Sequence, residues 1–491
     1  MLRAKGAEAY AVESEQTVVG AYPDKSLPVL KERANVKIVE AFALTVNVEV
    51  EPGLDGGCGR RGQGKQREKS RESGARYHGE MSTTELGEPF ASPAAQDLEH
   101  QYLIQNYSRY PLLLRRGKGC YVYDSTGKRY LDLIAGIGVN ALGHSHPRIV
   151  KAIREQAALL IHCSNLYYHD FQGPLAKRLA ETSGLARVFF TNSGTEAMEG
   201  ALKMIRSHGR RISEEKFEIV SLENSFHGRT LGALSVTGQA KYRRDFEPLL
   251  PGVRFVPPND LGALEAAVGE NTSGIVIEAI QGEGGVYPVS VEYLRKAREL
   301  ADRHNALLVF DEIQCGVGRP GTYYAYQLAE PVVLPDVMVA AKPIACGLPL
   351  GAIVADEEAA ATIGPGMHGS TFGGGALACR VALEFFDILD GLLPSISKTG
   401  GCFRTELIEL ARHFGFIKEV RGFGLMIGVE LDIPGKQFVT DAMEEGMLIN
   451  CTHDVVLRFL PPYIITEGEV DRAVEKLKKI FKKSAVRPVQ A

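Results

Sequence analysis

The sequence predicts an α/β fold built on a mostly parallel β-sheet that is covered by helices. Apolar runs of five or six residues recur along the chain, as buried strands do. These runs lie at 187–191, 217–221, 274–279, 306–311 and 336–340. Segments with helical spacing lie between them, and alternating strands and helices favour a parallel sheet with helices on both faces.

Three segments, 195–207, 291–304 and 468–481, repeat apolar residues at helical spacing, so that each predicts a helix with one buried face. The apolar residues are, in chain order, Ala197, Ala201, Met204, Ile205, Leu294, Ala297, Ala301, Val470, Ala473, Val474, Leu477 and Phe481. We expect the last of these helices to close a smaller C-terminal α/β unit.

Composition indicates an ordinary globular protein of the cytoplasm. The chain has 491 residues, a net charge of −4 and 45% hydrophobic residues, which argues against nucleic-acid or membrane-surface partners. No apolar run approaches the roughly 20 residues of a membrane-spanning helix, and the first residues lack the apolar core of a signal peptide. Eight cysteines without C-x-x-C spacing are typical of reduced thiols.

The first part of the chain differs in composition from the rest. Residues 1–52 form an extension of unknown role, in which 46–51 alternate as a short strand would. Residues 53–94 predict a disordered linker, because the glycine-rich and charged stretch within them has too few large apolar groups to offset its ordering entropy. Met81 is a candidate native start, which would make residues 1–80 a fusion remnant or a misassigned upstream start.

Three features that could take part in chemistry follow predicted strands. The sequence NSGTEA (192–197) enters a helix and suits a phosphate, with Ser193, Gly194 and Thr195 at the turn. Asp311 follows the run 306–310, and Lys342 lies in the small, apolar stretch VMVAAKPIACGLPLGA (337–352). Since ligands of such sheets gather at the carboxyl ends of the strands, we expect these features to meet.

Each feature also has a structural interpretation. Ser193 or Thr195 could be only a helix N-cap. Asp311 could be paired with a neighbouring arginine such as Arg319, and Lys342 could extend from a strand end to solvent. His144 and His146 could suggest a metal, but a pair without further ligands is more often structural, and we predict no metal site.

Together, the three features match the needs of pyridoxal 5'-phosphate. A buried lysine amine stays unprotonated and can form an imine with the aldehyde of this cofactor. A carboxylate can hold the proton on the pyridine nitrogen, and a helix terminus can hold the phosphate. We therefore interpret Lys342 as a Schiff-base lysine.

Eight blocks of sequence between about residues 95 and 483 resemble the class III, ω-amino group aminotransferases of the fold-type-I pyridoxal enzymes, most closely their acetylornithine branch. The blocks are NALGHSHP, FFTNSGTEAMEGALK, FHGRTLGALSVTG, IEAIQGEGGV, LLVFDEIQCGVGR, AAKPIACGLPLGA, HGSTFGGGALAC and LINCTHDVVLRFLPP. The resemblance implies a large pyridoxal-phosphate-binding domain at 151–385. It also implies a small α/β domain made from 95–150 and 386–491.

The resemblance implies a role for each site residue. Lys342 and Asp311 would be catalytic, as the Schiff-base lysine and the partner of the pyridine nitrogen. The other residues that would contact the cofactor are Ser193, Gly194, Thr195, Phe226 (stacked on the ring), Gln314 (at the ring hydroxyl) and Thr371 (at the phosphate). Ser370 and Thr371 would come from the neighbouring subunit of a homodimer with shared active sites.

The resemblance also assigns the substrate contacts. Arg229 would bind the carboxylate far from the reacting carbon, and Arg458 would bind the α-carboxylate of glutamate or 2-oxoglutarate. Glu283 would pair with Arg458 when the amine donor is bound, and Ser370 would contact the substrate. A plain structural ion pair is the alternative for Glu283 and Arg458.

The expected reaction transfers the terminal amine of N2-acetyl-L-ornithine to 2-oxoglutarate, giving N-acetyl-L-glutamate 5-semialdehyde and L-glutamate, a step of arginine biosynthesis. Ornithine, 4-aminobutyrate or N-succinyl-diaminopimelate are alternative donors. An aminomutase is a further alternative, and so is a non-catalytic pyridoxal-fold binding protein. The presence of both arginines argues against the aminomutase, and the presence of Lys342, Asp311 and Thr371 argues against the binding protein.

Overall fold

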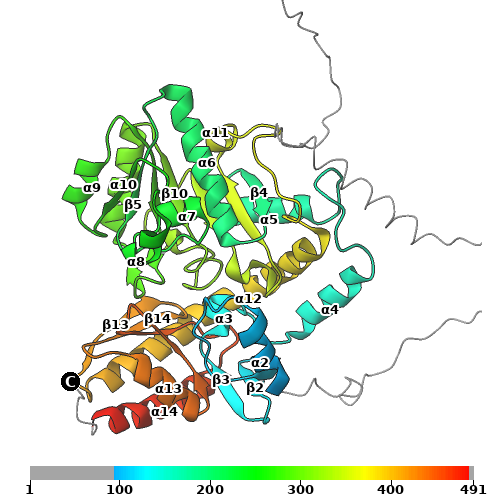
Figure 1. Cartoon of the computed structure of the whole chain (residues 1–491), viewed down its shortest axis with the longest axis vertical. Coiled ribbons are helices and arrows are strands. Elements are labelled where there is room, and N and C mark those ends of the chain that lie inside the picture. The colour runs from blue at the N-terminus through cyan, green and yellow to red at the C-terminus, as the bar shows by residue number, and fades with distance from the viewer. Residues whose placement is uncertain (1–92, 486–491) are drawn as a thin grey trace, which may run out of the picture. The chain divides into compact units, whose positions relative to one another are not determined.

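A seven-stranded sheet forms the centre of the computed structural model, which describes residues 93–485 (Figure 1). Its strands, in spatial order, are β4 (Arg187–Thr191), β12 (Gly351–Ala355), β11 (Val337–Ala340), β10 (Leu307–Asp311), β7 (Thr272–Ile277), β5 (Glu218–Leu222) and β6 (Val253–Val256). All neighbours pair in parallel except β12, which is antiparallel to both β11 and β4. The prediction of a mostly parallel α/β sheet is therefore confirmed.

The five predicted strands are present, with ends that shift by up to two residues. The sequence analysis missed β6 and β12. The strand β12 lies inside the apolar stretch that follows Lys342, where residues 343–350 contain no charged residue that would mark the start of a new strand.

Both faces of the central sheet are buried, so its strands are apolar at successive positions. Along β10, Leu308 and Phe310 belong to one core cluster, and Leu307 and Val309 belong to the other. The helix α6 (Gly194–Ile212) packs over the second face, with Ala197, Ala201, Met204 and Ile205 all buried. The helices α5 (Gln172–Ser183) and α10 (Val291–Arg303) contribute to the first cluster.

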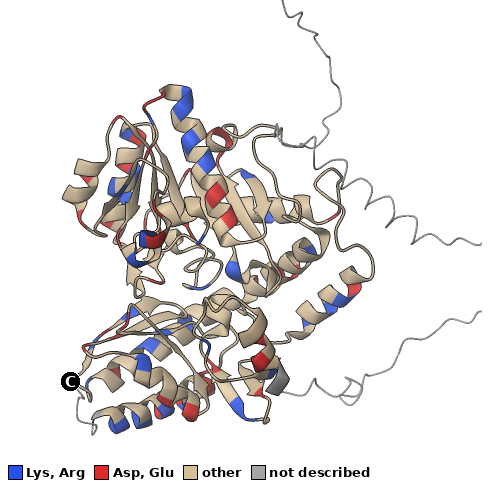
Figure 2. Ribbon diagram, viewed as in Figure 1, with Lys and Arg blue, Asp and Glu red and all other residues tan. Residues whose placement is uncertain are grey.

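Charged side chains on α6 follow the helix dipole. The first turn contains Glu196, and the last turn contains Arg210 and Arg211. Figure 2 shows acidic residues near one end of this helix and basic residues near the other. Negative charge near a helix N-terminus and positive charge near its C-terminus stabilise the helix.

Two four-stranded sheets form a second part of the structure, here called the small-sheet region. One contains β1 (Leu114–Lys118), β2 (Tyr121–Asp124), β3 (Arg129–Asp132) and β15 (Met447–Leu448), and the other contains β13 (Ile417–Phe423), β14 (Met426–Leu431), β17 (Val456–Phe459) and β16 (Asn450–Thr452). In the first of these sheets β3 pairs in parallel with β15, so segments from the two ends of the described chain share a sheet.

The remaining elements connect and cover these sheets. The long α12 (Ala376–Ala411) contacts both β13 and the turn that contains Lys342, and α14 (Glu467–Ala485) buries the five apolar residues predicted for it. The others are α2 (Pro93–Tyr102), α3 (Ala135–Gly138), α4 (Pro147–Ala157), α7 (Leu231–Ser235), α8 (Ala240–Arg243), α9 (Leu261–Ala267), α11 (Glu357–Ala360), α13 (Lys436–Glu444), β8 (Ile280–Gln281) and β9 (Tyr287–Pro288).

Several predictions concern the beginning of the chain. The extension 1–52, its strand 46–51 and Met81 lie outside the described residues. The linker predicted for 53–94 also lies outside them, except for its last two residues, which begin α2. Within residues 93–485, no helix is long and apolar enough to cross a membrane.

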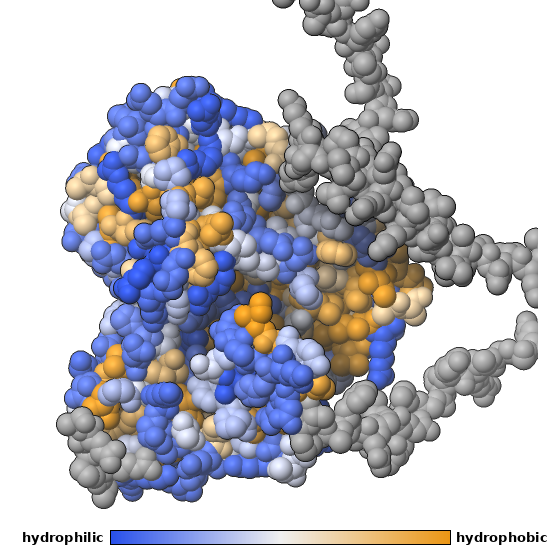
Figure 3. Space-filling view, in the orientation of Figure 1, coloured by the Kyte–Doolittle hydropathy of each residue, from blue (hydrophilic) through white to orange (hydrophobic). Residues whose placement is uncertain are grey.

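An exposed apolar surface follows α4. Figure 3 shows apolar side chains gathered on the side of the molecule where α4 lies. The exposed residues there, here called the apolar face, are Leu159, Ile161, Leu166, Tyr167, Tyr168 and Phe372. The ring of Phe372 lies 5.4 Å from that of His162, which joins the two segments of this face.

Glu312 is a buried carboxyl group inside the fold. It accepts hydrogen bonds from the backbone N–H groups of Ala325 (2.8 Å) and Tyr326 (3.1 Å). Burial raises the pKa of Glu312 from 4.5 to about 7, although these two hydrogen bonds lower it. The folded state thus favours the protonated form, and the protein loses stability as the pH rises from about 4.5 to about 7.

We expect Glu312→Gln to remove this pH dependence, because the amide oxygen keeps an acceptor without a charge. Between pH 5 and pH 8 the wild type should lose about 3 kcal/mol relative to the variant. Urea denaturation at both pH values measures the difference, and Glu475→Gln, at an exposed position, is the matched control. Equal pH responses of wild type and Glu312→Gln would contradict this account.

Candidate active site

A pocket of about 570 Å³ opens at the carboxyl ends of the central strands. Its lining includes Thr195 at the start of α6, Phe226 and Arg229 in the loop after β5, Asp311 at the end of β10, and Lys342 after β11. The strand register explains why these residues lie close together, since β12 pairs Gly351 with the end of β4 and Ala352 with the end of β11. The strand ends that carry these features therefore lie at one edge of the sheet.

The start of α6 is capped and also tied to the next loop. Ser193 is the N-cap, and its hydroxyl accepts a hydrogen bond from the N–H of Glu196 at 3.3 Å. The capping interpretation is thus correct for Ser193. Thr195 instead accepts from the N–H groups of Arg229 (3.1 Å) and Thr230 (3.3 Å). Further N–H groups of the first helical turn have no intrahelical acceptor and remain suited to an anion.

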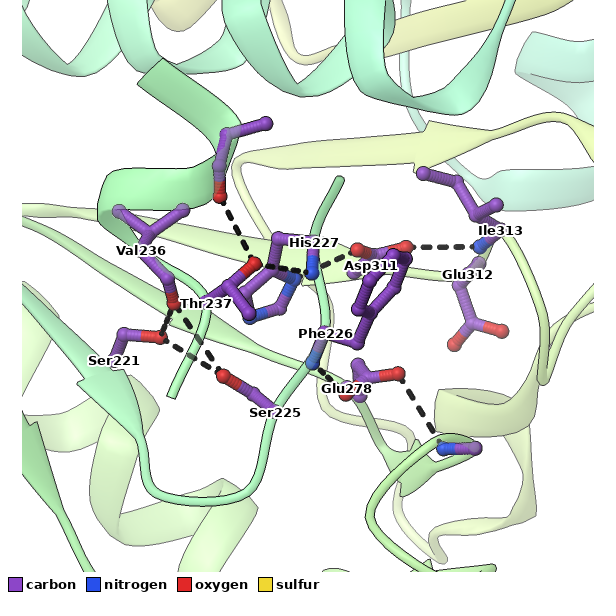
Figure 4. A network of polar contacts seen from close by, with 12 residues as sticks. Ser221, Ser225, Phe226, His227, Val236, Thr237, Glu278, Asp311, Glu312 and Ile313 are labelled. Carbon is purple, nitrogen blue, oxygen red and sulfur yellow. Dashed lines mark hydrogen bonds and ion pairs between the residues drawn. The ribbon is translucent and has the colours of Figure 1, made fainter. Parts of the chain in front are cut away.

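Asp311 pairs with a histidine that the sequence analysis did not single out. His227 Nδ1 lies 2.7 Å from Asp311 Oδ2, and the N–H of Ile313 donates to Asp311 Oδ1 at 3.0 Å (Figure 4). Burial lowers the pKa of His227, but the hydrogen bond and the charge of Asp311 outweigh it and leave the pKa raised. Asp311 is thus paired with a buried histidine inside the protein.

Pairing of Asp311 with Arg319 is wrong. The guanidinium of Arg319 donates to the carbonyl groups of Leu425 and Pro461 and lies over the ring of Tyr463. Arg319 therefore joins the central part of the structure to the small-sheet region. The partner of Asp311 is His227 instead.

Glu278 is a second buried carboxyl group in the pocket wall, also visible in Figure 4. It accepts hydrogen bonds from the N–H groups of Phe226 (3.0 Å) and Gly282 (3.4 Å). Burial, together with the charge of Asp311, raises the pKa of Glu278 to about 7 against the opposing effect of His227. Glu278 directly follows β7, and Asp311 is the last residue of β10. A carboxylate at a strand end was the signal that identified Asp311, and it would also have identified Glu278.

Lys342 lines the same pocket as Asp311 and begins a short 3₁₀ turn, Lys342–Ala345. Its φ of 35° lies in the left-handed region, a strained conformation for a residue with a long side chain. Burial lowers the pKa of Lys342 and outweighs the charges of Asp311 and Glu283, which raise it. The amine can therefore lose its proton more readily than an exposed lysine.

Arg458, Glu283 and Gln314 form a compact polar cluster beside the pocket. Arg458 Nη1 lies 2.6 Å from Glu283 Oε1 and 2.8 Å from Gln314 Oε1. Gln314 Nε2 also donates to Glu283, at 3.2 Å. Burial would raise the pKa of Glu283, but Arg458 and Gln314 outweigh it and lower the pKa. The predicted contact between Glu283 and Arg458 is therefore present, and Gln314 connects it to the pocket lining.

Arg229 lies at the exposed side of the pocket. Its guanidinium carbon is 3.9 Å from the ring centre of Tyr242 and 5.4 Å from that of Phe226. These contacts orient the side chain, and within residues 93–485 no acidic side chain pairs with it, so its charge is available to an anion.

Ser370 and Thr371 do not line the pocket of Lys342. They lie in a separate hollow with Asn192, Glu196 and Phe372. Asn192 contributes to both hollows and donates a hydrogen bond from Nδ2 to Ser370 Oγ at 3.2 Å. Within one chain, the structure thus brings together all predicted site residues except these two.

The family model described as aminotransferase class-III matches residues 102–481. The chain belongs to the class-III aminotransferase family. An acetylornithine aminotransferase of Methanocaldococcus jannaschii is 47% identical over 388 residues, which cover 78% of this chain and 97% of the relative.

Solved class-III aminotransferase structures are also similar. The N-acetylornithine aminotransferase of Stenotrophomonas maltophilia superposes with a TM-score of 0.69 at 34% identity, over 80% of this chain and 100% of that one. An ornithine aminotransferase of Toxoplasma gondii, whose structure shows partial occupancy of pyridoxal phosphate, gives 0.77 at 34% identity, over 81% and 96%.

The pocket of this aminotransferase fits pyridoxal phosphate in its donor set and its size. It combines a lysine amine of lowered pKa, a charged carboxylate held by His227, and a helix N-terminus. Its volume of about 570 Å³ lies in the range of small-molecule sites, about 300–1,000 Å³. The open N–H groups of the helix and the carboxylate of Asp311 lie at the same edge of the sheet. The N–H groups suit the anionic phosphate of this cofactor, and the carboxylate suits its protonated ring nitrogen.

Gly228 lets the Phe226 loop approach the start of α6. Its φ is 138°, and a Cβ there would lie 2.3 Å from Thr195 Oγ1. We expect Gly228→Ala to displace the loop and to weaken pyridoxal phosphate binding by roughly 10-fold or more, as overpacking of a tight contact does. Fluorescence titration of the cofactor-free protein measures the affinity.

Gly262→Ala is the control for this variant, because a Cβ at Gly262 meets only Asp260 at an ordinary 3.5 Å. Unchanged cofactor affinity in Gly228→Ala would show that the close contact does not set the loop position.

Proposed function

We propose that this protein uses pyridoxal 5'-phosphate to move the terminal amine of N2-acetyl-L-ornithine to 2-oxoglutarate. The products are N-acetyl-L-glutamate 5-semialdehyde and L-glutamate, and the reaction belongs to arginine biosynthesis. The observation that carries the proposal is the Arg458–Glu283 pair beside the pocket of Lys342 and Asp311. The names of the relatives, acetylornithine aminotransferases at 43–47% identity, support it.

In this proposal, pyridoxal phosphate supplies an aldehyde for the amine and a ring that withdraws electrons from the reacting carbon. Lys342 would hold its aldehyde carbon and Asp311 its ring nitrogen, while Ser193, Gly194 and Thr195 would hold the phosphate. Phe226 would stack on the ring, and Gln314 would contact its hydroxyl group. Asp311, kept charged by His227, holds a proton on the ring nitrogen, which sustains the withdrawal of electrons.

Lys342 then moves a proton from the donor carbon that bears the amine. Its lowered pKa, caused by burial, leaves the Nζ atom free to accept this proton at a lower pH than an exposed lysine could. The acid–base function and the attachment of the cofactor thus both depend on one amine in a pocket.

The two substrates present carboxylates at different distances from the reacting carbon. Arg229 binds the distant carboxylate, and Arg458 binds the carboxylate next to the reacting carbon of glutamate or 2-oxoglutarate. When N-acetylornithine is bound, Arg458 has no substrate carboxylate to bind, and Glu283 neutralises it. A buried cation left without a partner is costly, so this exchange of carboxylates allows one pocket to serve both half-reactions.

Ornithine, 4-aminobutyrate and N-succinyl-diaminopimelate are the alternative donors. Similarity to ornithine aminotransferases of known structure favours ornithine among these. A non-catalytic binding protein would need neither Lys342 nor the Arg458–Glu283 pair. The cytoplasmic location and the domain boundaries 95–150, 151–385 and 386–491 stay predictions.

We expect Lys342→Ala to abolish turnover, with a loss of at least 1,000-fold, because it removes both the attachment point and the base. The measurement is a half-reaction without any keto acid. The visible absorption of the bound cofactor is followed while N-acetylornithine, ornithine or 4-aminobutyrate is added separately to wild type and variant.

Bleaching of the wild type by N-acetylornithine, reversed by 2-oxoglutarate, supports the proposal. Faster bleaching by another donor would replace the substrate and keep the chemistry. No bleaching by any donor would favour the binding protein, and undiminished activity of Lys342→Ala would overturn the mechanism.

We further propose a homodimer in which Ser370 and Thr371 of each subunit complete the partner's site. Two observations support it: these residues lie outside the pocket of their own chain, and the apolar face beside them is exposed. Exposed apolar patches of this kind are typical of interfaces.

Mixed dimers provide a test of this arrangement. Thr371→Asp places a negative charge where the phosphate would lie, and we expect it to be inactive alone. Mixing it with Lys342→Ala should restore activity, because one site of each hybrid dimer then has both Lys342 and Thr371 intact. Mixing Lys342→Ala with the double variant Lys342→Ala/Thr371→Asp is the control. No restoration in hybrids isolated by two affinity tags would contradict shared sites.

A further inference from the structure

Glu283 lies in the turn between β8 and β9. Side chains of the small-sheet region bind the backbone of this turn. The hydroxyl of Thr452, in β16, donates to the carbonyl oxygen of Glu283 at 2.6 Å. Arg421, in β13, donates to the carbonyl oxygen of Gly285 from both Nε (3.0 Å) and Nη2 (2.7 Å). Side chains of two strands thus bind two carbonyl groups of one short turn.

Arg421 is itself fixed in place. Its side chain is 5% exposed and forms ion pairs with Glu419 (2.8 Å) and Glu430 (2.6 Å). Its guanidinium lies 3.6 Å from the ring centre of Tyr287, and the Tyr287 hydroxyl donates to Glu430 at 2.6 Å. A guanidinium held on several sides is a rigid support for the Gly285 carbonyl group.

The central part of the structure fixes the other end of the turn. Gln281 Nε2 donates to the carbonyl oxygen of Glu223 at 2.8 Å, and the N–H of Gly282 donates to Glu278 at 3.4 Å. The backbone from Gln281 to Gly285 is therefore anchored at both ends. The Glu283 side chain, 23% exposed, keeps contact with solvent as well as with Arg458.

We propose that Thr452 and Arg421 are positioning residues that hold the backbone of this turn, so that only the side chain of Glu283 moves on and off Arg458. The proposal rests on the carboxylate exchange of the proposed function and extends it to residues that touch neither substrate nor cofactor. Without these anchors the turn would also move, and Glu283 would spend less time on Arg458.

The direction of the effect follows from competition. A dicarboxylate that binds Arg458 must displace Glu283 first. If Glu283 is held less firmly on Arg458, the dicarboxylate binds more tightly, and discrimination between the two half-reactions decreases. Loss of an anchor should therefore strengthen dicarboxylate binding, whereas general damage to the fold would weaken it.

The test measures the Kd of glutarate, a five-carbon dicarboxylate, for the protein loaded with pyridoxal phosphate, by calorimetry. We expect Glu283→Gln to tighten glutarate binding by about 10-fold, and Thr452→Val to tighten it by about 5-fold, the scale of one hydrogen bond. Thr452→Ser keeps the hydroxyl and should restore the wild-type Kd. The double variant Thr452→Val/Glu283→Gln should bind like Glu283→Gln alone, because Thr452 acts through Glu283.

Control variants match the chemistry at sites away from the turn. Thr405→Val removes a hydroxyl that donates to the carbonyl group of Gly401 in α12. Arg421→Met removes the second anchor and should tighten glutarate binding in the same direction as Thr452→Val. Its control is Arg206→Met, which removes a guanidinium that donates to the carbonyl group of Pro251. Neither control should change the Kd of glutarate.

The outcomes separate two failures. If Glu283→Gln leaves the glutarate Kd unchanged, the carboxylate exchange of the proposed function is wrong and this inference falls with it. If Glu283→Gln tightens binding but Thr452→Val does not, or if Thr452→Val tightens it equally in the Glu283→Gln background, the positioning roles alone are wrong. Thr452→Val tests the positioning role even if Arg421→Met fails to fold.

Discussion

The charge of Asp311 is the constraint on which the rest of the site depends. A carboxylate at the end of a buried strand becomes neutral unless it has a cationic or N–H partner. His227 and the N–H of Ile313 supply those partners at 2.7 Å and 3.0 Å. Glu278 lies in the same wall, and burial together with the charge of Asp311 raises its pKa to about 7.

This arrangement assigns different tasks to the two carboxyl groups. Asp311 pairs with His227 and lines the pocket, whereas Glu278 accepts hydrogen bonds from two loops, from the N–H groups of Phe226 and Gly282. Glu278 therefore links the loop that contains Phe226 to the turn that contains Glu283. In the proposed function, an anchored backbone and a mobile Glu283 side chain occur together beside the pocket, as a site with two dissimilar substrates would require.

Much of the fold and most of the site could be predicted from the sequence, for local reasons. Buried parallel strands are recognised by their uninterrupted apolar runs, and Asp311 and Lys342 stand out as charged residues at the ends of such runs. The contact of Glu283 with Arg458 followed from the family motifs. By contrast, His227 was overlooked because its partner is distant in sequence, and β12 because the residues directly before it, 343–350, are uncharged.

The anchors Thr452 and Arg421 illustrate a second limit. Nothing in their local sequence distinguishes a threonine or an arginine that binds a backbone carbonyl group from one that faces solvent. Their partners, the carbonyl groups of Glu283 and Gly285, carry no sequence signal at all. Such contacts become visible only once strands far apart along the chain are placed beside one another.

The pairing of β3 with β15 has a consequence for the order of events on the ribosome. The central sheet is complete once synthesis has passed β12, so its strands can assemble while the chain is still growing. Leu131, however, pairs with Met447, which is made much later. The edge of β3 that will receive β15 must therefore wait unpaired through most of translation, and an unpaired strand edge is where a nascent chain is most exposed to wrong partners.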